Sequence, residues 1–367
     1  MHHTVLACLA FFIMSRSGAE GDLTSSWVTG PQGGGSQTDV AACTVDQLLP
    51  FQAPDGGWTE GGWVLDTDEA RPAYDCSCPY YKARYFCPKI TSERSRLFWQ
   101  PPSVASGQCK TVPIVDLQRN FLPDGYTVLV FTNSHGREMV ESLLCQFSDQ
   151  VVSRNVTTSD TPADYESQRQ NLIGLDEQCR GMSTYGRKQL VENGCIDPTE
   201  DRTFKCKDDR SSFYFHNGAS IHYRFSDMPD KDIDREIANF GLTPDGVDVI
   251  LANQGNNAVK LPRSKLQTTA KRVSKSGALV LWLTMFGGDG YYREEKEQKE
   301  LAAAGVTQVN LGVMGTAECA QSWRTMAGTE DRYTVDRHFC MPGPADEMGL
   351  LVVQMVWAHH LVQTSTP

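Results

Sequence analysis

Short apolar segments that alternate with helical segments fill most of the chain beyond residue 126. The segments 126–131 and 247–252, YTVLVF and VDVILA, are rich in residues that buried strands use. Strand-type residues also occupy 213–225. Because strands that alternate with helices form parallel sheets, the pattern predicts an α/β fold with helices on both faces of the sheet. The other expected elements are a strand over 277–286 and helices over 136–147, 232–240, 292–304 and 348–363.

The first residues have the pattern of a signal peptide. An apolar run, 5–14, precedes Ser17-Gly18-Ala19, small residues of the kind that signal peptidase prefers. The run is shorter than the roughly 20 apolar residues of a membrane-spanning helix. We therefore expect a cleaved signal over 1–19, with a short membrane anchor as the alternative, and no membrane span in the mature chain.

The cysteines predict an oxidising compartment. The chain has 12 cysteines, and removal of Cys8 with the signal leaves 12 − 1 = 11, scattered along the sequence rather than grouped in metal-binding pairs. In a secreted chain this pattern favours disulfides over zinc, and the odd number predicts one free or intermolecular thiol. Asn155-Val156-Thr157 is a glycosylation sequon. Both features predict a protein of the secretory pathway, either in the Golgi lumen or secreted.

Changes in composition divide the mature chain. A glycine-rich stretch lies in 20–42, which we interpret as a linker or stalk. The rest, 43–367, is interpreted as one catalytic domain. Its parts are an irregular lobe rich in Cys, Trp and Pro over 43–113 and an α/β core over 114–367, which carries a disulfide-pinned insertion over 151–210.

The charge of the chain excludes one class of partner. The formal net charge is −11 and the pI is about 5.2, so the surface repels phosphate backbones and nucleic acid is not an expected partner. His359-His360 is interpreted as a surface pair rather than a metal site, and His216 and His222 as structural residues in a strand. No metal or other cofactor is expected.

Three short segments could carry chemistry. Ser134 lies where a strand runs into a helix, and a helix N-terminus favours a developing oxyanion; Ser134 is therefore either a nucleophile or an ordinary N-cap. Asn253, followed by Gly255, ends a strand and is either an oxyanion donor or part of a turn. His338, near Asp336, is either a general base or a loop histidine.

Taken in order, these segments and four others resemble the trichome-birefringence-like polysaccharide O-acetyltransferases, which belong to the PC-esterase group of SGNH/GDSL-type acyl enzymes. The family's nucleophile segment reads F-V-G-D-S-x-S-R-N-Q-x-E-S-L-L-C, and residues 130–145 read VFTNSHGREMVESLLC. The other matching fragments are Gly62-Trp63-Val64-Leu65-Asp66, Cys78-Pro79 with Phe86-Cys87, Leu97-Phe98-Trp99-Gln100-Pro101 with Cys109 and Pro113, 215–223 (FHNGASIHY), Asn253-x-Gly255 and 338–343 (HFCMPG).

The resemblance implies an SGNH-like α/β/α sandwich and a role for several residues. Ser134 matches the nucleophile and His338 the general base. Asn253, Gly255 and Arg137 match positions near the oxyanion and the substrate. It also implies the disulfides Cys43–Cys109, Cys87–Cys340 and Cys78–Cys145.

The chain departs from the family at three places. Thr132-Asn133 stands where the family has Gly-Asp before the serine, and Val335 stands at the expected triad acid. Asp336 is the nearest replacement for that acid, with Asp331 and Asp346 as alternatives. The family's tryptophans after the Asn-x-Gly segment are replaced by Asn256-Asn257-Ala258.

The expected function is acetyl transfer through a serine acyl-enzyme, with a polysaccharide or other glycan as the acceptor. A secreted esterase of the same fold would pass the acetyl group to water. A degenerate member would bind glycan without turnover. The sequence does not specify the acetyl donor or the glycan.

Overall fold

A computed structural model describes most of the expected core. The described residues are 40–52, 59–65, 78, 97–132, 134–158, 208–225, 233–253, 268, 271–272, 275–284, 295–312, 314, 324–327, 334–339 and 344–365. The expected signal peptide, most of the stalk and most of the insertion lie outside these residues.

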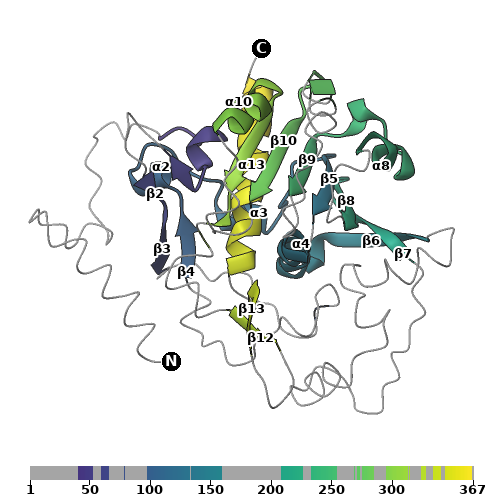
Figure 1. The fold of residues 1–367 in the computed structure, drawn as a ribbon, viewed down its shortest axis with the longest axis horizontal. Helices are drawn as coiled ribbons and strands as arrows, with labels where there is room; N and C mark the ends of the chain where they lie inside the picture. The colour runs from purple at the N-terminus through teal and green to yellow at the C-terminus, as the bar shows by residue number, and fades with distance from the viewer. Residues whose placement is uncertain are drawn as a thin grey trace, which may run out of the picture.

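The core is a seven-stranded, mostly parallel sheet with the strand order β11-β10-β9-β5-β8-β7-β6 (Figure 1). The parallel strands are β5 (Thr127–Thr132), β8 (Ser220–Phe225), β9 (Val249–Asn253), β10 (Leu279–Thr284) and β11 (Val306–Asn310). Numbered along the chain, the parallel strands have the order 2-1-3-4-5, which is a doubly wound arrangement. The other two strands, β7 (Asp208–Phe215) and β6 (Val151–Thr158), are antiparallel and form one edge.

That edge differs from the expectation of a parallel sheet. Residues 213–225 are not one strand but parts of β7 and β8, which meet at a turn where Gly218 has φ 78°. The expected insertion begins with a strand, because the β-branched valines and threonines of β6 favour pairing with β7. As a result His216 lies in the turn, whereas His222 lies in a strand as expected.

Helices cover both faces of the sheet. The helices α4 (Ser134–Gln146) and α13 (Pro344–Ser365) pack on one face, and α8 (Ile233–Asn239) and α10 (Glu295–Ala303) on the other. The other helices among the described residues are short: α2 (Pro102–Ala105), α3 (Ile114–Leu117) and the 3-10 turns Asp46–Leu48, Ser148–Gln150 and Pro244–Gly246.

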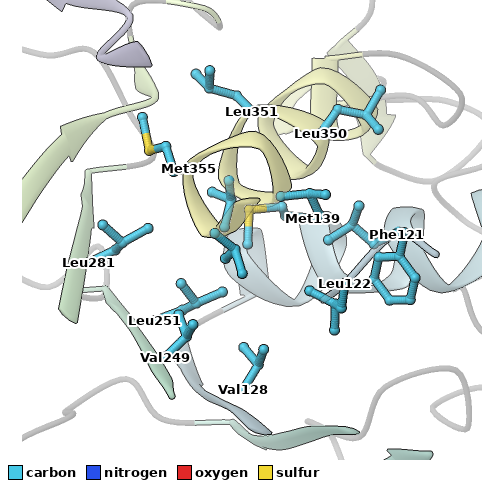
Figure 2. Close-up of a cluster of buried hydrophobic side chains, with 14 of the residues drawn as sticks. Phe121, Leu122, Val128, Met139, Val249, Leu251, Leu281, Leu350, Leu351 and Met355 are labelled. Carbon is cyan, nitrogen blue, oxygen red and sulfur yellow. The ribbon is translucent and has the colours of Figure 1, made fainter. Parts of the chain in front are cut away.

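Successive side chains of each strand point to opposite faces of the sheet, so the apolar residues form two separate cores. In β5, Val128 and Val130 face α4 and α13, whereas Leu129 and Phe131 belong to the cluster on the α8 and α10 face. Figure 2 shows the first cluster, in which Leu251 and Leu281 from the sheet lie near Met139 and Met355 from the helices. The fully apolar strand sequences are therefore explained by burial on both sides.

Helix α13 is the central helix of the larger core. Its residues are buried from Pro344 to Val356, and it approaches α4 so closely that a Cβ on Gly349 would lie 2.7 Å from Leu143 Cγ. Within the described residues, no helix combines the length and apolarity that crossing a membrane requires.

The N-terminal region is attached to α13 and α4 by defined contacts. Gln354 exchanges two hydrogen bonds with the main chain of Val112, at 2.8 and 2.7 Å. A short ribbon is formed by β3 (Gly62–Leu65) and β4 (Leu97–Gln100). In β4, the main-chain N–H of Trp99 donates a hydrogen bond to the buried Glu347 carboxylate at 2.9 Å. A second short ribbon pairs β1 (Phe51–Gln52) with β2 (Thr59–Glu60).

We predict that Gly349→Ala lowers the free energy of unfolding by about 1–2 kcal/mol, because overpacking outweighs the roughly 1 kcal/mol gain in helix propensity. Urea denaturation measures the change. In a Leu143→Ala background the same substitution should be neutral or stabilising, since the obstructing side chain is gone. Stabilisation by Gly349→Ala in the otherwise wild-type protein would contradict the close contact.

Candidate functional site

The ends of β5 and β9 meet at the centre of the sheet. The two strands pair in parallel from Val128↔Val249 to Phe131↔Ala252, so Thr132 and Asn253 end neighbouring strands at the same edge. The strand order also reverses here, because β8 lies on one side of β5 while β9, β10 and β11 lie on the other. Doubly wound folds bind ligands at the carboxyl ends of the strands at this switch point. Two segments that the sequence selected are therefore brought together.

Ser134 is the first residue of α4, two residues after β5 ends. The first four N–H groups of a helix lack intrahelical acceptors and favour negative charge. A serine at this position is thus close to main-chain donors suited to an oxyanion. The structure describes the backbone of Ser134 and Asn253, and Gly255 lies outside the described residues.

A close contact fixes how β5 runs into α4. A Cβ on Gly136 would lie 2.2 Å from Thr132 Cβ and 2.5 Å from its Oγ1, so only glycine fits beside this threonine. The family segment has glycine at the position of Thr132 and serine at that of Gly136. Compared with that segment, the large and small residues are exchanged in this chain, and the exchange is compatible with the close contact. Sequence reasoning noted the lost glycine but missed its counterpart four residues later.

Arg137 is buried on the first turns of α4. Its Nε lies 3.5 Å from Glu141 Oε1, and the two side chains are 2% and 0% exposed. Burial of a charge is costly unless it is paired, and this ion pair is consistent with that requirement. A contact between Arg137 and substrate stays a prediction.

His338 and Asp336 lie in a strand rather than in the expected loop. The strand β13 (Thr334–Phe339) pairs with β12 (Arg324–Ala327), with Val335 opposite Met326. Figure 1 shows this ribbon beyond the N-terminal end of α13, and β13 ends five residues before that helix begins. Residues two apart in a strand occupy the same face, so the backbone places positions 336 and 338 on one face of the ribbon. The contacts of His338 with Asp336 and Ser134 stay predictions.

The alternative acid Asp346 has a role in packing. It is buried near the start of α13 and accepts a short hydrogen bond from the Ser142 hydroxyl of α4. Gln146 Nε2, which also donates to Ser142 Oγ at 3.1 Å, lies 3.5 Å from the same carboxylate oxygen. This carboxylate therefore joins the helix that begins with Ser134 to the helix that follows His338. The other alternative, Asp331, lies outside the described residues.

Two of the three disulfides implied by the resemblance are present. Cys43 is bonded to Cys109 within the N-terminal region, and Cys78 is bonded to Cys145 in α4. Cys87 and Cys340 lie outside the described residues, so their bond stays a prediction. The backbone of Asn155 lies in the edge strand β6. None of the described cysteines is free. The predicted free or intermolecular thiol would therefore be a cysteine outside the described residues, and it stays a prediction.

Three of the described histidines, His222, His359 and His360, make hydrogen bonds within the fold. His222 is buried in β8, and its ring nitrogens hydrogen-bond the hydroxyls of Ser212 at 2.9 Å and Ser220 at 3.1 Å. Burial lowers the pKa of His222 to about 4. The pair His359-His360 is half-buried rather than on the surface, because His359 bonds the Gly277 carbonyl at 2.8 Å and His360 the Tyr126 hydroxyl at 3.1 Å.

Among the residues that the structure describes, no group of three or more His, Cys, Asp or Glu side chains could hold a metal ion.

No family model matches the chain, and neither does any curated protein. The resemblance to the O-acetyltransferase family rests on the sequence motifs alone and stays a prediction.

We predict that Gly136→Ser alone destabilises the protein by about 2–3 kcal/mol, because the new side chain overlaps Thr132. The double variant Thr132→Gly/Gly136→Ser should be more stable than the sum of the single changes by at least about 1 kcal/mol. Chemical denaturation of the four proteins measures this coupling. Gly62→Ser is the control, since a Cβ there meets nothing within 4 Å. Additive effects would contradict the steric exchange.

His222 should make the protein less stable in acid. Its folded pKa of about 4 lies below the roughly 6.5 of an unfolded histidine. As the pH falls from about 6.5 to about 4, the unfolded state binds a proton that the folded state does not. The free energy of unfolding therefore drops by up to about 1.4 kcal/mol per pH unit.

We predict that His222→Gln reduces this slope by up to about 1.4 kcal/mol per pH unit, the contribution of one proton. Denaturation across the same pH range measures the slope. His216→Gln, at an exposed histidine in the β7–β8 turn, is the matched control for the loss of a histidine elsewhere in the fold. Equal slopes in the wild type and His222→Gln would show that His222 does not cause the loss.

Proposed function

We propose that this protein is a polysaccharide O-acetyltransferase that passes an acetyl group through Ser134 to a glycan hydroxyl. The observation that carries the proposal is the position of Ser134, as the first residue of α4 at the switch point between β5 and β9. Strand ends at a switch point are where doubly wound enzymes place catalytic groups. The seven motifs that resemble the family, in the same order, support the assignment of Ser134 as the nucleophile.

The reaction has two steps. Ser134 Oγ attacks the acetyl carbonyl carbon while His338 accepts the serine proton. As the tetrahedral intermediate collapses, His338 gives this proton to the departing donor group, which leaves the acetyl group on Ser134. The glycan hydroxyl then attacks the acyl-enzyme and loses its proton to His338, which returns it to Ser134 Oγ as the acetylated glycan is released. The Ser134 N–H and Asn253 would hold the oxyanion, and Asp336 would orient the histidine.

The disulfides support a place in the secretory pathway, in the Golgi lumen or outside the cell. Bonds such as Cys43–Cys109 form and persist in oxidising compartments. Polysaccharides are synthesised and displayed in the same compartments, so the proposed acceptor and the proposed location agree.

One observation favours a second candidate, a degenerate glycan-binding protein. Val335, at the family's acid position, pairs with Met326 in the β12–β13 ribbon and cannot orient a histidine. Loss of the acid without replacement typically lowers turnover by about 10⁴.

Ser134→Ala should abolish acetyl transfer, with a loss of at least about a thousandfold, because the nucleophile is removed. The test follows hydrolysis of a chromogenic acetyl ester, with and without oligosaccharide acceptors, and detects acetylated product by mass spectrometry. Ser148→Ala, at an exposed serine just beyond α4, is the matched control and should keep full turnover.

The outcomes separate the candidates. Acceptor-dependent acetylation supports the transferase, and release of acetate without acceptor indicates an esterase. Glycan binding without either reaction indicates the degenerate binder. Wild-type turnover in Ser134→Ala would remove the nucleophile assignment.

A further inference from the structure

The last residue of β5 carries a hydroxyl that the fold does not use. Thr132 is 0% exposed, and its Oγ1 has no hydrogen-bond partner in the part of the chain that the structure describes. The residues before it in the strand, Val128 to Phe131, are all apolar. A buried hydroxyl without a partner costs free energy, and valine would fill the same space without that cost. The hydroxyl therefore calls for an explanation other than packing.

The position of the Thr132 hydroxyl suggests a functional explanation. Oγ1 lies 2.5 Å from the place of a Cβ on Gly136, so it lies against the first turn of α4. The N–H groups at the start of that turn, from Ser134 to Gly136, have no acceptor within the helix. A buried oxygen with free lone pairs thus lies beside a turn whose first N–H groups have no acceptor within the helix, and Oγ1 accepts no hydrogen bond among the described residues.

We propose that Thr132 is a positioning residue for Ser134, whose hydroxyl accepts a hydrogen bond from a first-turn N–H in the reacting state. This inference rests on the proposed function. Hydrogen bonds of active sites are often incomplete without substrate and tighten only around the transition state. When charge develops on the oxyanion, the turn closes on it, and the bond to Thr132 holds the Ser134 N–H in the direction of that charge. Since Thr132 is buried, it acts through the turn and not on the substrate.

The alternative is a tolerated, unused hydroxyl, and the chain offers a control for it. Ser211 Oγ, in β7, is likewise buried without a hydrogen-bond partner among the described residues, and it lies in a strand two places from β5. Removal of either hydroxyl should leave Tm equal or higher, because each relieves an unpaired polar group. Only the change at Thr132 should alter turnover.

The test compares Thr132→Val, Thr132→Ser and Ser211→Ala in the acetyl-transfer assay, with Tm measured in parallel. We expect Thr132→Val to lose about tenfold in kcat with KM unchanged, the size of one hydrogen bond made only in the transition state. Thr132→Ser keeps the hydroxyl and should stay within about twofold of the wild-type kcat, even though its lost methyl group lowers Tm. Ser211→Ala should keep the wild-type kcat.

Wild-type kcat in a folded Thr132→Val would overturn the inference and leave the proposed function standing. A wild-type protein with no turnover that depends on Ser134 would overturn both. If Thr132→Val does not fold, Thr132→Ala and Thr132→Ser form a second pair that differs only in the hydroxyl. Equal kcat values in that pair would also overturn the inference.

Discussion

The packing of α4 against α13 is the interaction on which the rest of the structure depends. Gly349 lets the two helices approach until Leu143 would touch a Cβ, and Asp346 joins them through Ser142. The helices also cover the larger core over β5, β9 and β10. Because α4 begins with Ser134 and α13 follows the strand of His338, the same contact sets the relation between the two proposed catalytic segments.

The N-terminal region strengthens that contact from outside. Cys78–Cys145 ties it to the end of α4, while Trp99 and Val112 bind Glu347 and Gln354 on α13. A carboxylate or amide buried beside a helix is costly unless its partners are held in place, so these contacts make the region part of the core rather than an appendage. This explains why a cysteine-rich segment precedes an otherwise ordinary α/β fold.

The central strands could be predicted because burial on both faces makes β5, β9 and β10 continuously apolar. The edges could not, since β6 mixes valine and threonine with polar residues, and β11 buries only Val306 and Val309, on opposite faces. The placement of the segments of Ser134 and Asn253 at one edge of the sheet comes from the parallel pairing of β5 with β9. The Thr132–Gly136 contact could not be predicted, because it joins residues across a strand–helix junction, where neither the period of a strand nor that of a helix applies.

The two departures from the family motif therefore have different weight. Thr132 stands where the resembled motif has glycine and Gly136 where it has serine, so the two differences fit each other in the close contact between these residues. Val335 has no such counterpart among its described neighbours, since it pairs with Met326. The strand that holds it nevertheless places positions 336 and 338 on one face, which favours Asp336 over Asp346, because Asp346 already joins α13 to α4. On this argument, the proposed activity would depend on the Asp336 carboxylate, and Asp336→Asn should lower kcat far more than it lowers stability.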